Sequence, residues 1–90
     1  MIRLSGRLIC TTRTEAQAVL LHLPDHIRLT RAEPGCLSFE VTQDSDPLIW
    51  QVAECFTDQT ALDAHQARTR ASEWFTATQA IRREYKITEG

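Results

Sequence analysis

The 90-residue sequence lacks the features that mark several large classes of protein. It contains no apolar run long enough to cross a membrane, and the residues that follow Met1 do not form a signal peptide. Its formal net charge is only −2, which gives no reason to expect nucleic acid or an anionic membrane as a partner. We therefore expect a cytoplasmic protein that binds neither.

Cysteine is also scarce. The three cysteines, Cys10, Cys36 and Cys55, are an odd number with no close pair, and each falls in a predicted strand. We interpret them as buried, reduced thiols of a cytosolic protein.

The sequence has little that could hold a cofactor. Its three glycines form no phosphate-cradling loop, and its histidines and cysteines form no cluster at metal-ligand spacing. His22 and His26 are four residues apart, but no third ligand accompanies them, so we expect both to lie at the solvated surface. We predict a protein with no cofactor and no metal.

What is present is typical of one small globular domain spanning residues 1–90, since 42% of the residues are apolar and 24% are charged. A domain of this size has a thin core. Apolar residues on both faces of the predicted strand 48–56 therefore favour a homodimer that buries one face of the sheet.

The chain is organised around a strand that follows the pair Pro34-Gly35, which ends the preceding helix. Leu37, Phe39 and Val41 alternate with polar or small residues, as in a half-buried strand. The same period predicts strands at 2–10, 48–56 and 82–88, with Tyr85 and Ile87 on the apolar row of the last. Gly6 lies on the apolar row of the first strand. A glycine there indicates either a bulge or twist of the strand, or room for a ligand against the sheet.

Two helical regions connect these strands. Thr12 and Glu15 form a capping box at the start of the first, and Pro24 should kink that helix or divide it. Asp58 caps the second, and Thr69 or Ser72 can begin a separate piece of it. The apolar residues of the first helix recur at helical spacing: Ala16, Val19, Leu20, Leu23 and Ile27.

The order strand, helix, strand, strand, broken helix, strand predicts an α+β fold of the ferredoxin-like βαββαβ type, with one four-stranded antiparallel sheet backed by helices on a single face. Glu54 interrupts the apolar row of the strand 48–56, where burial without a partner would be costly. It must face solvent or a dimer rim, or meet a cation or hydrogen-bond donor inside.

Three segments, Glu33–Val41, Val52–Phe56 and Ala61–His65, resemble the antibiotic biosynthesis monooxygenase family in order and spacing. The resemblance covers nearly the whole chain. It implies a homodimer whose two sheets meet in a dimeric α/β barrel, with a pocket between sheet and helices in each subunit. The family includes cofactor-independent monooxygenases that act on quinols and aromatic polyketides. It also includes haem-degrading enzymes, a sugar-phosphate isomerase and members with no assigned activity.

The resemblance also indicates site residues. His65 matches a recurrent pocket histidine of the family and is our candidate catalytic residue, since histidine titrates near neutral pH. At the position where a second histidine often follows in the family, this chain has Arg70, so the resemblance does not extend to two-histidine chemistry, and Arg70 is a candidate anion partner. Glu54 is a further pocket candidate, and the candidate apolar walls are Phe39, Trp50, Trp74 and Phe75. A purely structural role for His65, and for these aromatic residues, stays open.

The resemblance implies a cofactor-independent monooxygenase that oxidises a small, electron-rich aromatic such as a hydroquinone with O₂, and these residues could support that chemistry. Such a reaction needs a deprotonated substrate in a dry aromatic pocket, with a base and donors for the developing anion. Two alternatives remain. One is a dimeric ligand-binding or stress-associated module without turnover, and the other is an isomerase that uses His65 as a proton shuttle.

Overall fold

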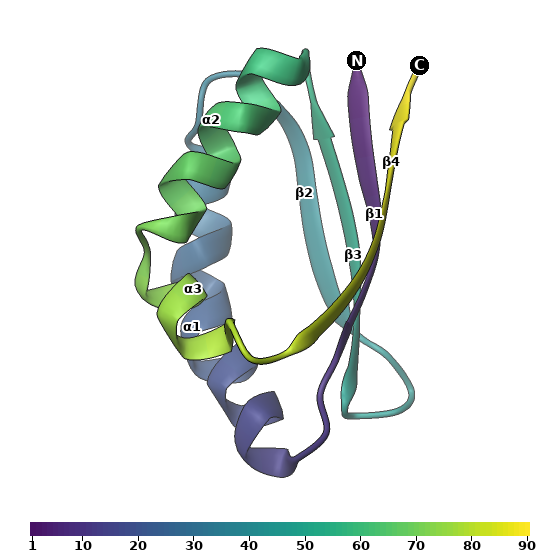
Figure 1. Ribbon diagram of the computed structural model, residues 1–90, viewed down its shortest axis with the longest axis vertical. Coiled ribbons are helices and arrows are strands. Elements are labelled where there is room, and N and C mark those ends of the chain that lie inside the picture. The colour runs from purple at the N-terminus through teal and green to yellow at the C-terminus, as the bar shows by residue number, and fades with distance from the viewer.

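A computed structural model describes all of residues 1–90 and shows one antiparallel sheet with the helices packed on one of its faces (Figure 1). The strands lie in the order β2-β3-β1-β4. This confirms the ferredoxin-like α+β fold, whereas the dimeric barrel stays a prediction. Along the chain the elements are β1 (Ile2–Ile9), α1 (Arg13–Arg31), β2 (Cys36–Gln43), β3 (Ile49–Phe56), α2 (Gln59–Arg70), α3 (Glu73–Thr78) and β4 (Arg82–Glu89).

The main core lies between α1 and the centre of the sheet. Leu8 on β1 and Val19 on α1 are fully buried there, and Trp50 on β3 is 4% exposed. The alternating pattern of β1 and β3 predicted this face correctly, because successive residues of a strand point to opposite sides of a sheet. Ile2, Phe56 and Leu62 form a smaller apolar cluster under α2.

Helix α1 is continuous, so of the two outcomes expected at Pro24, a kink or a division, the division is wrong. Val19 and Leu23 before the proline and Thr30 after it are buried against the same surface. This packing holds both parts of the helix in line, and the hydrogen bond that Pro24 cannot donate is lost on an exposed side. The predicted cap at Thr12 is present, since its hydroxyl accepts from the Glu15 amide, but the Glu15 carboxylate accepts from Thr11.

Two predicted core leucines are exposed instead. Leu37 is 56% exposed because β2 has a bulge between Cys36 and Ser38, which reverses the phase of the alternation. Cys36 therefore packs against the core in its place. Leu20 is 56% exposed on the outer side of α1.

Strand β4 forms an edge of the sheet that the helices leave poorly covered (Figure 1). Tyr85 and Ile87, predicted on its apolar row, are 41% and 51% exposed. Gly6 lies opposite Tyr85 in a regular ladder without a bulge. A Cβ atom at Gly6 would collide with the main-chain oxygen of Glu84, so this glycine allows β1 and β4 to approach closely.

The cysteines are all free, but only Cys10 is buried, whereas Cys36 and Cys55 are half-buried. The interpretation of three buried thiols is therefore wrong for two of them. No helix is long and apolar enough to cross a membrane.

Candidate active site

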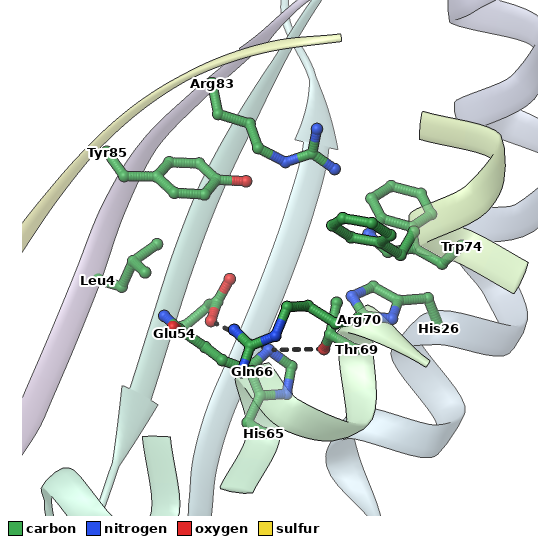
Figure 2. Close-up of a pocket in the computed structure, with 11 residues that line it drawn as sticks. Leu4, His26, Glu54, His65, Gln66, Thr69, Arg70, Trp74, Arg83 and Tyr85 are labelled. Carbon is green, nitrogen blue, oxygen red and sulfur yellow. Dashed lines mark hydrogen bonds and ion pairs between the residues drawn. The ribbon is translucent and has the colours of Figure 1, made fainter. Parts of the chain in front are cut away.

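A cavity of about 260 Å³ lies between the sheet and the helical layer, on the side where α2 and α3 cover it (Figure 2). Strands β1, β3 and β4 supply one wall, and the three helices supply the other. Its lining residues are Leu4, His26, Glu54, His65, Gln66, Thr69, Arg70, Trp74, Phe75, Arg83 and Tyr85.

Helix α2 places His65 at this cavity. Asp58 caps the helix by accepting from the Ala61 amide at 2.8 Å, and Leu62 is 1% exposed in the small apolar cluster under α2. His65 follows Leu62 by three residues and therefore shares its buried face. The imidazole is 5% exposed, as expected for a side chain carried inward with Leu62.

The partner of His65 is a residue that the sequence analysis did not single out. An oxygen of the Glu33 carboxylate lies 2.7 Å from Nδ1 of His65 and also accepts from Arg68 at 3.1 Å. Because a carboxylate only accepts, Nδ1 carries the hydrogen in this bond, which leaves Nε2 as the atom that faces the cavity side.

Glu33 reaches α2 because the chain turns tightly beside it. Gly35 has a φ of +87°, and a Cβ atom there would lie 2.6 Å from Cβ of Ala61. Only glycine allows both this conformation and this close approach to α2. The Pro34-Gly35 pair was thus a usable signal for Glu33, but the sequence did not indicate what it would contact.

Glu54 lies on the other side of the imidazole. The carboxyl is 8% exposed on β3, and its Oε1 is 3.6 Å from Nε2 of His65, with no hydrogen-bond partner of its own. Burial, and to a lesser degree the charge of Glu33, raises the pKa of Glu54 to about 7. Glu54 therefore points inward rather than to solvent, but without the hydrogen-bond donor that the inward alternative expected.

His26 is buried, so the prediction of a surface histidine is wrong. Because α1 is continuous, His26 lies on the same helix face as Leu23 and Thr30 and is 4% exposed. Its ring stacks on Trp74 at a centroid distance of 4.6 Å and an angle of 3°. Burial, followed by the nearby Arg68 charge, lowers the pKa of His26 to about 3, so its ring is neutral at ordinary pH.

The remaining predicted pocket residues divide into two sets. Arg70, Trp74 and Phe75 line the cavity beside His65 and Glu54. Phe39 is 2% exposed and lies next to the rings of His26 and His65 without lining the cavity, while Trp50 belongs to the main core. Phe39 lies after the bulge in β2 and still points inward, but helix α1 packs over its side chain.

Strand β4 contributes two cavity residues that the sequence analysis did not assign to the site, Arg83 and Tyr85. Arg83 donates to the carbonyls of Thr78 and Ile81 and to the hydroxyl of Thr78, at 2.8 to 3.0 Å. Although the Tyr85 ring is partly exposed, its hydroxyl points into the cavity (Figure 2), and burial there raises the pKa of the phenol against the opposing effect of Arg83.

The arrangement defines a ferredoxin-like domain in which a histidine is held between two carboxyl groups at the edge of a cavity. No group of three or more histidine, cysteine and acidic side chains is placed to hold a metal ion. A family model described as antibiotic biosynthesis monooxygenase matches residues 3–77. The chain belongs to this family.

Solved structures share the fold. A candidate antibiotic biosynthesis monooxygenase from Deinococcus radiodurans is 22% identical with a TM-score of 0.84, covering 100% of this chain and 92% of its own. One from Nitrosomonas europaea is 18% identical with a TM-score of 0.82, covering 100% and 98%. A conserved protein from Methanosarcina mazei is 22% identical with a TM-score of 0.78, covering 97% and 89%. At these identities the likeness shows the fold alone. No curated protein sequence matches the chain significantly.

Proposed function

We propose that this protein is a cofactor-independent monooxygenase that oxidises a small, electron-rich aromatic such as a hydroquinone. The observation that carries the proposal is the pair formed by His65 and Glu54 at the cavity, 3.6 Å apart and both buried. A carboxyl with a pKa of about 7 beside an imidazole nitrogen can accept or return a proton near neutral pH.

The reaction begins with removal of a phenolic proton. Glu33 holds the hydrogen of the imidazole on Nδ1, so Nε2 presents a lone pair toward the cavity and Glu54. The proton of the substrate passes to this pair. The resulting phenolate is electron-rich enough to transfer one electron to O₂, and the radical pair combines to form a carbon–oxygen bond on the ring.

The reaction then ends in loss of water. The ring carbon that bears the new hydroperoxide loses its hydrogen as a proton, the O–O bond breaks, and the outer oxygen leaves as water. A hydroquinone and O₂ thus give a hydroxyquinone and water, so the substrate itself supplies both electrons that reduce the second oxygen atom. Trp74 and Phe75 supply apolar surface beside the reacting groups, and a less polar surrounding strengthens electrostatic interactions.

Oxygen consumption tests the proposal. The purified protein, with no added cofactor, is mixed with a menadiol-type hydroquinone, and the rate is corrected for autoxidation. We expect His65→Ala to lower the catalysed rate by roughly 10²-fold or more. The control is His22→Ala, which removes a half-buried histidine that makes no hydrogen bond and does not line this cavity.

Unchanged oxygen uptake in His65→Ala, with a normal rate in the control, would overturn the catalytic role of His65. Binding of the hydroquinone without any uptake in the unmodified protein would favour the ligand-binding module. Conversion of a sugar phosphate to an isomer without uptake would favour the isomerase.

A further inference from the structure

Two arginines at the cavity have no acidic partner. Arg70 of α2 and Arg83 of β4 both line the cavity, yet every ion pair in the protein involves other basic residues. The only carboxyl group in the lining is Glu54. Because its pKa is about 7, Glu54 neutralises at most part of this positive charge at neutral pH. The cavity therefore has an excess of positive charge in a protein whose net charge is −2.

Arg83 is held in a fixed position. Its guanidinium donates to the main-chain oxygens of Thr78 and Ile81 and to the Thr78 hydroxyl, which itself is fully buried. These bonds use both hydrogens of Nη1 and one of Nη2, which leaves the adjacent donors on Nε and Nη2. Neither of these two donors bonds a carbonyl or a carboxylate, and the Tyr85 hydroxyl is close enough to interact with the guanidinium on that side. A guanidinium that is held in place with two adjacent donors turned to a ligand matches the planar, bidentate geometry of a carboxylate.

The position of Arg83 relative to the reactive pair is equally informative. Figure 2 shows Arg83 and the hydroxyl of Tyr85 on the side of the cavity away from His65, with Glu54 and His65 together on the other. A ligand that spans the cavity would meet donors of positive character at one end and the proton-accepting pair at the other. The exposed Arg70 lies near the second end, at the surface of α2.

Size limits the ligand further. Ligand pockets usually measure roughly 300–1,000 Å³, and this cavity of about 260 Å³ lies just below that range. It accommodates one aromatic ring or two fused rings with small substituents. Leu4, Trp74 and Phe75 supply apolar surface for such rings.

We propose that the site selects a hydroxylated aromatic carboxylate, whose carboxylate binds Arg83 with support from Tyr85 and whose phenolic hydroxyl faces Glu54 and His65. Arg70, which is exposed at the surface of α2, adds long-range attraction for the anion. This inference rests on the proposed function for the fate of the hydroxyl, but recognition of the carboxylate is independent of turnover.

The test compares two ligands of the same shape, 2,5-dihydroxybenzoate and its neutral analogue 2,5-dihydroxybenzamide. Dissociation constants are measured without oxygen, from the quenching of tryptophan fluorescence, because Trp74 lines the cavity. A charge-assisted, bidentate contact predicts that the carboxylate binds about 10- to 100-fold more tightly than the amide. Equal dissociation constants in the unmodified protein would overturn the inference.

Three arginine variants locate the effect. Arg83→Gln should abolish most of the preference, and Arg70→Gln should reduce it a few-fold with a weaker dependence on salt. Arg13→Gln is the control, because Arg13 is exposed, unpaired and away from the cavity. If Arg83→Gln does not fold, Arg83→Lys replaces it, since lysine keeps the charge and loses the planar fork.

The preference for the carboxylate over the amide must fall in the Arg83 variant and persist in the control, Arg13→Gln. A full preference in Arg83→Gln, or in Arg83→Lys where that variant is needed, would overturn the assignment of Arg83. A clear preference for the carboxylate without oxygen uptake in air would leave this inference standing and would overturn the proposed function instead.

Discussion

The two halves of the space between helices and sheet are filled in opposite ways. Under α1, apolar side chains such as Leu8, Val19 and Trp50 form a packed core. Under α2 and α3, the buried side chains include His65 and Glu54, and a cavity remains beside them. Both halves rest on the same face of one sheet (Figure 1).

The helices account for this difference. Helix α1 has 19 residues and presents a continuous buried face to the sheet. The second helical region consists of α2 with 12 residues and α3 with six, and a break near Ser72 separates them. A short, broken helix covers less of the sheet, so space and partly exposed residues remain next to β4. Burial of ionisable groups there costs stability, which the packed half must supply.

The largest expected effect is a difference between the two halves in the loss of stability that a truncated side chain causes. Leu8→Ala removes a fully buried side chain from the packed core and should lower the free energy of unfolding by about 2–5 kcal/mol. The comparison change is Ile87→Ala on the poorly covered edge strand β4, at a residue that is 51% exposed, and it should alter this free energy by less than about 0.5 kcal/mol. Urea unfolding measures both. Similar losses in the two variants would contradict the contrast.

The next effect concerns Glu54 and pH. Its pKa is about 7 in the folded protein against an ordinary 4.5, so the unfolded chain releases this proton first as the pH rises. Stability is therefore lost between pH 4.5 and pH 7, by about 3 kcal/mol in total. Glu54→Gln cannot ionise at this position. The free energy of unfolding of this variant, relative to that of the unmodified protein, should therefore rise by this amount between pH 4.5 and pH 8, as measured by urea unfolding at both pH values. Parallel stability curves would show that Glu54 titrates normally.

His26 should show the opposite dependence. Its pKa falls from 6.5 to about 3 on folding, so the unfolded chain binds the proton first as the pH falls, and stability decreases below pH 6.5. His26→Phe keeps an aromatic ring against Trp74 and cannot bind a proton. Between pH 7 and pH 5 it should gain about 2 kcal/mol relative to the unmodified protein, as measured by urea unfolding. A relative stability of His26→Phe that rises toward high pH instead would contradict this prediction.

The smallest effect compares the first turns of the two helical regions. Asp58→Ala and Thr12→Ala each remove an N-cap and should each lower stability by about 1 kcal/mol. Only Asp58 caps the helix that carries His65, so only Asp58→Ala should also weaken ligand binding at the cavity and speed amide exchange in α2. Equal effects of both variants on binding would show that the two regions are coupled as one unit.

Local patterns in the sequence predicted much of this molecule. The alternation in β3 placed Glu54 on the same face as Val52 and Phe56. The cap at Asp58 and the division of the second helical region were predicted correctly, and of the two candidate caps for its second piece, Thr69 and Ser72, the protein uses Ser72. The spacing of Leu62 and His65 turned the histidine inward. Family resemblance added the expectation of a cavity there, with Arg70, Trp74 and Phe75 around it.

Other features depended on contacts between distant segments. Glu33 meets His65 across 32 residues of chain, and Arg83 reaches the cavity from the last strand, so no local spacing could reveal either. Pro24 by itself predicted a kinked or divided helix, but packing on both sides of it kept α1 undivided and buried His26. Hydrophobic periodicity and helix capping depend on residues only a few positions apart. For that reason the sequence alone determined where the helices and strands lie. Which helices and strands meet decides the charges that surround the cavity, the partners of the histidines and the shape of the cavity. These features were therefore decided by the tertiary structure.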